Sequence, residues 1–202
     1  GNGLRTSEFR EPHSFGLAEG NLIAIQTGKG IEIWDWSDVQ NPIQVSKLPI
    51  SGVNFGDYNN VAWQLFWQAP YLYVSRGNAG LTIVDTNDVA NPFVVKTVAR
   101  SALGGFNIGP VFAVGNEMYL SSMEGTAGFS ILDISDPVNP VLSKTVSSLP
   151  QVYYSSCWDG NHAYFVPRSS GSQLRVYDTT QNPMPLINDQ LSGVVSLYCN
   201  TQ

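Results

Sequence analysis

The chain is short of charge and of cysteine. Charged residues make up 13% of its 202 residues, against about 25% in an average soluble domain. With 10 basic and 16 acidic residues, its net charge of −6 argues against nucleic acid as a partner. No apolar run approaches the roughly 18 residues of a membrane helix, so we expect no membrane span in this segment. Two cysteines, Cys157 and Cys199, are too few for a disulfide framework.

The sequence also lacks the motifs of common enzymes and metal sites. Its only histidines are His13 and His162, and it has no GxSxG, HExxH or P-loop motif. No CxxC motif or Cys/His cluster indicates zinc. We therefore expect no catalytic residue, no cofactor and no bound metal. The open alternative is that strands distant in sequence bring an acid, a base and a histidine together.

What the chain does have is a segment that recurs four times. The copies are IEIWDWSDVQNP (31–42), LTIVDTNDVANP (81–92), FSILDISDPVNP (129–140) and the shorter LRVYDTTQNP (174–183). Their aspartates, Asp35, Asp85, Asp133 and Asp178, lie 50, 48 and 45 residues apart. A short carboxylate accepts hydrogen bonds from backbone N–H groups two or three residues later. We therefore interpret these four aspartates as structural turn residues.

Each repeat contains four candidate strands. Apolar and polar residues alternate before each aspartate, a β-rich run follows each Asn-Pro, and two further runs precede the motif, as in PVFAV (110–114) and EMYLSS (117–122). Four antiparallel strands in a repeat of about 48 residues are typical of a β-propeller blade. The sequence therefore predicts an all-β protein with four four-stranded antiparallel blades.

The repeated motif also resembles a known family. Gly-Leu-x-Ile-Val-Asp followed by Ser-Asp-Pro-x-Asn-Pro resembles the LVIVD repeat of bacterial and archaeal surface and secreted propeller proteins. The third copy (128–140) fits this pattern closely, whereas the fourth lacks two loop residues and the second aspartate. The resemblance implies a propeller fold and an extracellular or cell-surface location. It implies no catalytic residue.

We expect one propeller domain or fragment over residues 1–202, with repeats at about 14–50, 61–100, 110–148 and 152–191. The segment 194–202 begins a fifth unit, in which Cys199 aligns with Cys157. We favour an incomplete part of a ring of about six to eight blades, with the rest of a parent chain as its neighbour. The alternative is a small closed ring completed by the terminal segments. A disulfide between the two cysteines and two buried thiols both remain open.

Loops at one end of a propeller are the usual ligand-binding segments. The connections between the second and third strands place Lys29, Arg76, Glu124 and Arg168 on a rim, and the loops that enter the inner strands add Tyr58, Asn59 and Tyr154. Arginine beside tyrosine is typical of contact surfaces for proteins or sugars, although solvated loops would also contain these residues. We favour a noncatalytic binding or scaffold module that contacts protein or carbohydrate through this channel mouth. The alternative is a propeller hydrolase or oxidoreductase with its site there or in missing blades.

Overall fold

A computed structural model describes residues 15–17, 20–54, 63–123, 125–147, 149, 153–167, 173–192 and 197. The regular structure of these residues consists of β-strands and one short 3-10 helix, η1 (Arg100–Ala102). None of their helices has the length and apolar character that a membrane crossing requires. The chain divides into two compact units, Gly1–Val98 and Ala99–Gln202.

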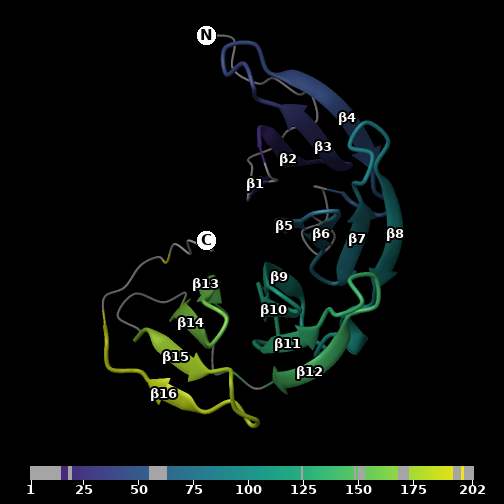
Figure 1. Ribbon diagram of the computed structural model, residues 1–202. Coiled ribbons are helices and arrows are strands. Elements are labelled where there is room, and N and C mark those ends of the chain that lie inside the picture. The colour runs from purple at the N-terminus through teal and green to yellow at the C-terminus, as the bar shows by residue number, and fades with distance from the viewer. Residues whose placement is uncertain are drawn as a thin grey trace. The chain divides into compact units, whose positions relative to one another are not determined.

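Unit 1 contains two four-stranded antiparallel sheets in which the strands pair in chain order (Figure 1). The first sheet consists of β1 (Phe15–Leu17), β2 (Leu22–Thr27), β3 (Gly30–Asp35) and β4 (Ile43–Pro49). The second consists of β5 (Gln64–Gln68), β6 (Tyr71–Ser75), β7 (Leu81–Asp85) and β8 (Phe93–Val98). Each sheet is therefore a meander that contains one copy of the repeated motif.

Unit 2 repeats this arrangement with two more meanders. The third sheet consists of β9 (Ile108–Val114), β10 (Glu117–Ser122), β11 (Phe129–Asp133) and β12 (Val141–Val146). The fourth consists of β13 (Tyr153–Trp158), β14 (His162–Pro167), β15 (Arg175–Asp178) and β16 (Leu186–Asn188). The four four-stranded antiparallel sheets predicted from the sequence are thus present.

Burial separates the middle strands of a sheet from its outer strand. In β6 and β7 nearly every residue is buried, whereas five of the six residues of β8 are exposed. A strand buried on both faces loses the simple alternation of apolar and polar residues, which explains runs such as Leu-Thr-Ile-Val in β7. The outer strands expose apolar residues, among them three at matching positions: Ile43, Phe93 and Val141.

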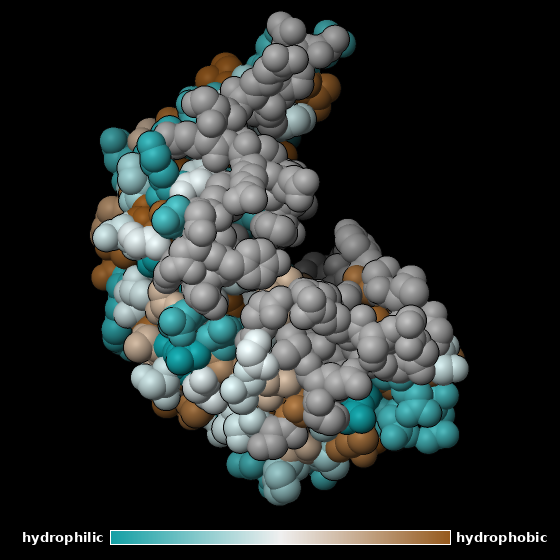
Figure 2. Space-filling model, turned by 180° about the vertical axis from the view of Figure 1, so that it is seen from behind, coloured by the Kyte–Doolittle hydropathy of each residue, from teal (hydrophilic) through white to brown (hydrophobic). Residues whose placement is uncertain are grey.

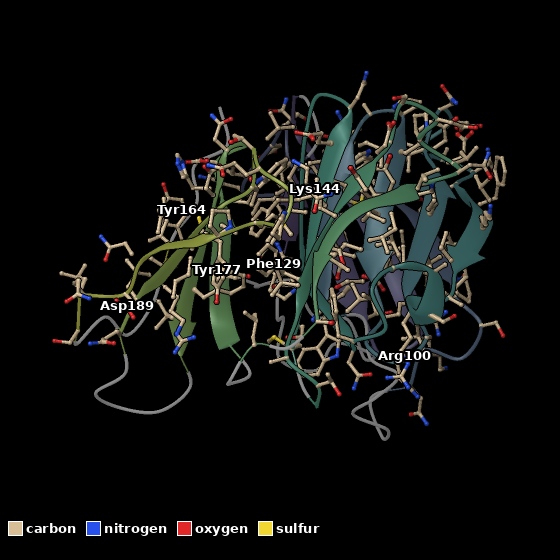
Figure 3. All side chains as sticks on the ribbon, turned by 90° about the horizontal axis from the view of Figure 1, so that it is seen from below. Arg100, Phe129, Lys144, Tyr164, Tyr177 and Asp189 are labelled. Atoms are coloured by element: carbon tan, nitrogen blue, oxygen red, sulfur yellow. The ribbon has the colours of Figure 1, made fainter. Side chains whose placement is uncertain are left out.

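The core of each unit lies between its two sheets. In unit 1, Ile31 and Ile33 of β3 belong to the same buried cluster as Leu65 and Trp67 of β5. In unit 2, Phe129 of β11 packs against Tyr177 of β15, with ring centroids 5.2 Å apart (Figure 3). Burial of large side chains such as these contributes about 1.5–3 kcal/mol each, so sheet-on-sheet packing is the main stabilising interaction.

Cys157 in β13 is disulfide-bonded. Cys199, the only other cysteine in the sequence, lies outside the described residues. The sequence left open whether the cysteines form a disulfide or remain buried thiols, and the structure has Cys157 in a disulfide. The number of blades in a complete ring, and the segment 194–202 as the start of a fifth unit, stay predictions.

Candidate binding site at the loop ends of the sheets

Each sheet has two chemically different ends. The aspartate end is where the third strand finishes at the repeated aspartate, as β3 does at Asp35. The loop end is where the second strand connects to the third, as residues 28–29 do between β2 and β3. The sequence predicted turn chemistry at the aspartate end and binding at the loop end.

At the aspartate end, each repeated aspartate accepts a hydrogen bond from the backbone N–H two residues later. The N···O distances are 2.8 Å for Asp35 and Ser37, 2.8 Å for Asp85 and Asn87, 2.7 Å for Asp133 and Ser135, and 2.9 Å for Asp178 and Thr180. Such a bond turns the chain at the end of the strand. The four aspartates therefore occupy equivalent turns in all four sheets.

These hydrogen bonds act on the ionised form of the carboxylates. The backbone N–H of Ser37 and the hydroxyl of Ser135 make the largest contributions that hold the pKa of Asp35 and Asp133 below its usual value. The pKa of Asp178 is lowered in the same way. Hydrogen bonds to a carboxylate favour its charged state, so the turns at Asp35, Asp133 and Asp178 are strongest when these aspartates are ionised.

The second aspartate of the motif also holds its own turn. Asp38 Oδ2 accepts a hydrogen bond from the side-chain amide of Asn41 at 2.9 Å, and Asp88 Oδ2 accepts one from Asn91 at 2.8 Å. Calcium would need these oxygens among its six to eight ligands. In the described part of the chain, no group of three or more His, Cys, Asp or Glu side chains is placed to hold a metal ion.

Two tryptophans join the aspartate end to the core. Trp67 Nε1 donates to Thr86 Oγ1, and Trp158 Nε1 donates to Thr179 Oγ1, both at 3.0 Å. Each threonine directly follows a repeated aspartate. In the first sheet, Trp36 stands at the position of these threonines, directly after Asp35, and its buried Nε1 has no hydrogen-bond partner. Trp67 and Trp158 are therefore buried in the cores between the sheets and do not form an exposed stacking surface.

The Asp159–His162 pair also lies at the aspartate end, in the β13–β14 hairpin. Asp159 Oδ2 is 3.3 Å from His162 Nδ1 and accepts a hydrogen bond from the Tyr164 hydroxyl at 2.8 Å. Asp159 Oδ1 accepts hydrogen bonds from the backbone N–H groups of Asn161 and His162. With these contacts the carboxylate holds the hairpin turn.

At the loop end of unit 1, two residues that the sequence singled out come to the same segment, 50–54. The carbonyl oxygen of Lys29 accepts a hydrogen bond from the backbone N–H of Ile50 at 2.8 Å, and the Lys29 side chain is exposed. Arg76 lies beside Gly52, because a Cβ at Gly52 would be 3.1 Å from Arg76 Nη2. Lys29 and Arg76 therefore flank the segment that leads into the second sheet.

Arg76 differs from a solvated loop residue. It is only 4% exposed, and its one side-chain hydrogen bond within the described residues joins Nη1 to Thr82 Oγ1 at 3.5 Å. Its Nε is buried without a partner. Burial lowers the pKa of the Arg76 guanidinium from its usual value. The sequence interpretation of Arg76 as part of an open rim must therefore be corrected to a buried cation beneath a loop.

The loop end of unit 2 holds a cation that sequence reasoning missed. Arg100 Nη1 donates to the Asn107 side-chain oxygen at 2.6 Å, and Asn107 O accepts a hydrogen bond from the backbone N–H of Met123. The Arg100 side chain is therefore bonded to Asn107, the residue at which segment 99–107 meets the β10–β11 connection. Arg100 could have been found from the sequence, because it lies in the loop that enters the third sheet, one of the loops expected to bind ligands.

The other predicted binding residues are not placed. Tyr58, Asn59, Glu124 and Arg168 lie outside the described residues, and for Tyr154 only its position in β13 is described. Their assignment to the rim stays a prediction. On the coloured part of the surface in Figure 2, apolar and polar residues are interspersed, and no single large apolar patch marks a site.

Comparison with known proteins fits this architecture. Four-stranded meanders of this kind are the blades of a β-propeller, and solved propellers match most of the chain. Sqt1 of Saccharomyces cerevisiae matches with a TM-score of 0.65 at 8% identity, over 88% of this chain and 48% of that one. A chain of a mitotic checkpoint complex matches with a TM-score of 0.63 at 12% identity, over 90% and 53%. The Cps50 (Swd1) β-propeller domain of Myceliophteria thermophila matches with a TM-score of 0.58 at 10% identity, over 83% and 56%.

The fold class is therefore that of a β-propeller, and the chain spans about half the length of these three structures. More particularly, the LVIVD repeat model matches residues 56–99 and 124–148, so the chain carries LVIVD repeats and the resemblance read from the sequence is confirmed. No curated protein matches the sequence significantly. Propellers generally serve in binding or scaffolding.

Proposed function

We propose that this protein is a noncatalytic binding or scaffold module of a surface or secreted protein, which contacts a protein or carbohydrate partner through its loop ends. The observation that carries the proposal is the separation of charge within the sheets. Nine of the 16 acidic residues lie at aspartate ends: Asp35, Asp38, Asp85, Asp88, Glu117, Asp133, Asp136, Asp159 and Asp178. Three of the ten basic residues, Lys29, Arg76 and Arg100, lie at loop ends.

This separation favours the loop ends as the contact surface for a partner with acidic groups. At the aspartate ends the carboxylates are engaged in their own turns, as Asp35 and Asp133 are. At the loop ends the cations stand in an acidic chain in which basic residues are scarce. Surface charge of one sign raises the rate at which an oppositely charged partner associates.

A secreted or cell-surface location forms part of the proposal. Cys157 is disulfide-bonded, and disulfides persist in oxidising compartments outside the cytoplasm. The surface or secreted setting of the LVIVD proteins that the sequence resembles agrees with this location. Protease accessibility of the protein on intact cells of the native source would test it: digestion without lysis supports the location, and complete protection contradicts it.

The binding proposal is tested by reversing charge at the loop ends. We expect the double variant Lys29→Glu/Arg100→Glu to capture its partner from the native source at least about tenfold less well than the unmodified chain, because two favourable charges become repulsive. Capture is measured by quantitative pull-down of protein and glycan together. The melting temperature is measured in parallel, to show that the variant is folded.

The matched control reverses charge on an outer strand. Lys96→Glu changes an exposed residue of β8 and leaves the loop ends intact, so capture should remain near that of the unmodified chain. Equal capture by the double variant and the unmodified chain contradicts the proposal. So does the absence of any retained protein or glycan.

A further inference from the structure

Arg76 is a buried cation without an acidic partner in the part of the chain that the structure describes. Its side chain makes one long hydrogen bond, from Nη1 to Thr82 Oγ1, and Thr82 in turn bonds Thr97 at 2.9 Å. No ion pair involves Arg76 within the described residues. Burying an unpaired charge costs several kcal/mol, which is why buried arginines in proteins are normally paired with a carboxylate or another anion.

The fold does not need arginine at this position. Strand register places Thr27 of the first sheet and Ser122 of the third at the position of Arg76, directly before the loop-end turn. Thr27 Oγ1 accepts a hydrogen bond from the N–H of Lys29, and Ser122 Oγ accepts one from the N–H of Gly128. Both hydroxyls satisfy their own turns.

In the second sheet the turn is closed by the backbone alone. The N–H of Arg76 donates to the carbonyl of Gly80 at 2.8 Å, and the N–H of Ala79 donates to the carbonyl of Arg76 at 2.9 Å. The guanidinium takes part in neither bond. Arg76 therefore destabilises the folded state relative to a threonine or serine at this position. No local contact of its side chain offsets this destabilisation.

One edge of the guanidinium is buried without a hydrogen-bond partner among the described residues. Nη1 faces Thr82, while Nε has no partner and Nη2 lies beside Gly52. The Nε and Nη2 N–H groups form the fork that binds a carboxylate through two parallel hydrogen bonds. Gly52 packs directly against Nη2, because a Cβ there would be only 3.1 Å from it, and the φ of +81° at Gly52 is a conformation that favours glycine.

We propose that Arg76 binds a single carboxylate of an acidic ligand through its Nε and Nη2 N–H groups, beneath Gly52. This inference rests on the proposed binding function and names the chemical group that the loop end of the second sheet recognises. A carboxylate matches the fork in shape and supplies the missing charge. The first and third sheets lack this fork, because their equivalent residues are a threonine and a serine.

The direct test follows the Arg76 Nε–H signal by NMR during titration with sodium acetate, with sodium chloride at matched ionic strength as the reference. Comparison with Arg76→Lys identifies the signal. Acetate should shift it downfield and saturate, and chloride should not. With binding followed instead by the backbone amide signal of Gly52 in both proteins, Arg76→Lys should bind acetate roughly tenfold less tightly, since an ammonium lacks the two-pronged fork. A signal that stays unmoved by acetate, or that responds equally to chloride, overturns the inference.

A second measurement separates a ligand-binding arginine from a structural one. Replacing an unpaired buried charge by an apolar side chain of similar length removes the desolvation cost, so Arg76→Met should raise the urea midpoint of unfolding. A large fall of the midpoint in this variant would mean that Arg76 holds the fold together, and the inference would be wrong.

Asp57 provides the control for a carboxylate supplied by the chain itself. It is the only acidic residue in 55–62, the segment that follows the described part of this loop. Asp57→Asn should leave both acetate binding and the urea midpoint unchanged. If it instead lowers the midpoint and alters the Arg76 signal before acetate is added, the partner is internal and the ligand-binding inference is overturned.

These outcomes are distinguishable from failure of the proposed function. The charge-reversal variant that tests the function changes Lys29 and Arg100 and leaves Arg76 in place. Loss of capture there with no acetate response at Arg76 would retain the binding module and remove the carboxylate site. An acetate response with undiminished capture would retain the site and contradict the loop-end partner surface.

Discussion

The aspartate ends of the four sheets repeat one turn, whereas the loop ends differ from sheet to sheet. At the aspartate end the same turn is repeated, with the same hydrogen bond from the backbone to the carboxylate in every sheet. At the loop end, equivalent positions hold Thr27, Arg76 and Ser122, and only the arginine leaves polar groups unsatisfied. Repetition at one end indicates a structural role, whereas variation at the other indicates where individual chemistry resides.

The largest effect should come from the core that joins adjacent sheets near the aspartate end. Trp158 is 1% exposed and stacks on Tyr119 with ring centroids 6.1 Å apart. Trp158→Ala removes this packing and should lower the free energy of unfolding by about 3–5 kcal/mol, measured by urea denaturation. Ile43→Ala, at a residue that is 66% exposed, is the control and should change stability by less than about 0.5 kcal/mol. Similar losses in the two variants would contradict the packing described.

A smaller loss should follow removal of the threonine that receives a tryptophan N–H. Thr86→Val keeps the shape of the side chain but leaves Trp67 Nε1 buried without an acceptor. The expected loss in unfolding free energy is about 1–3 kcal/mol. Thr86→Ser retains the hydroxyl and should recover most of it. If the serine variant is no more stable than the valine variant, the hydrogen bond is not the cause.

A pH dependence should arise from the aspartate ends. The pKa values of Asp35, Asp38, Asp88, Asp133 and Asp178 are all lowered, by hydrogen bonds to their carboxylates. A carboxylate whose pKa is lower in the folded than in the unfolded state stabilises the fold above the unfolded value, near 3.8 here. That stabilisation is lost as the pH falls through the lower folded values.

The urea midpoint should therefore be steady at neutral pH and fall as the pH drops below about 4. Asp133→Asn removes one of these titrating groups and should make the fall shallower. A midpoint that is independent of pH in the acid range, or a slope unchanged in Asp133→Asn, would show that these hydrogen bonds do not stabilise the fold.

The sequence predicted the fold well because the repeat constrains it four times. Alternation before each aspartate located the third strands, and the Asn-Pro runs located the outer strands. Even the weak fourth outer strand is present as the three-residue β16 (Leu186–Asn188). The turns at Asp35 and its equivalents follow from local chemistry, which a single sequence contains.

The candidate site was less accessible to sequence reasoning, because burial depends on contacts between distant segments. Gly52 lies 24 residues before Arg76 in the chain, and nothing in the sequence around Arg76 predicts that Gly52 will pack against its guanidinium. The link from Lys144 Nζ in β12 to the Thr179 carbonyl, at 2.5 Å, is equally non-local (Figure 3). Tertiary packing decides which segments of neighbouring sheets meet, and so it sets the environment of each loop-end side chain.

The contrast between the two ends is tested most directly by two variants in one repeat. Urea midpoints would be measured side by side for Asp85→Ala, at the aspartate end of the second sheet, and Arg76→Met, at its loop end. Shifts in opposite directions are expected, downward for the lost turn and upward for the removed buried charge. Two downward shifts of comparable size would mean that both ends serve the fold alike, and the assignment of binding to the loop end would lose its physical basis.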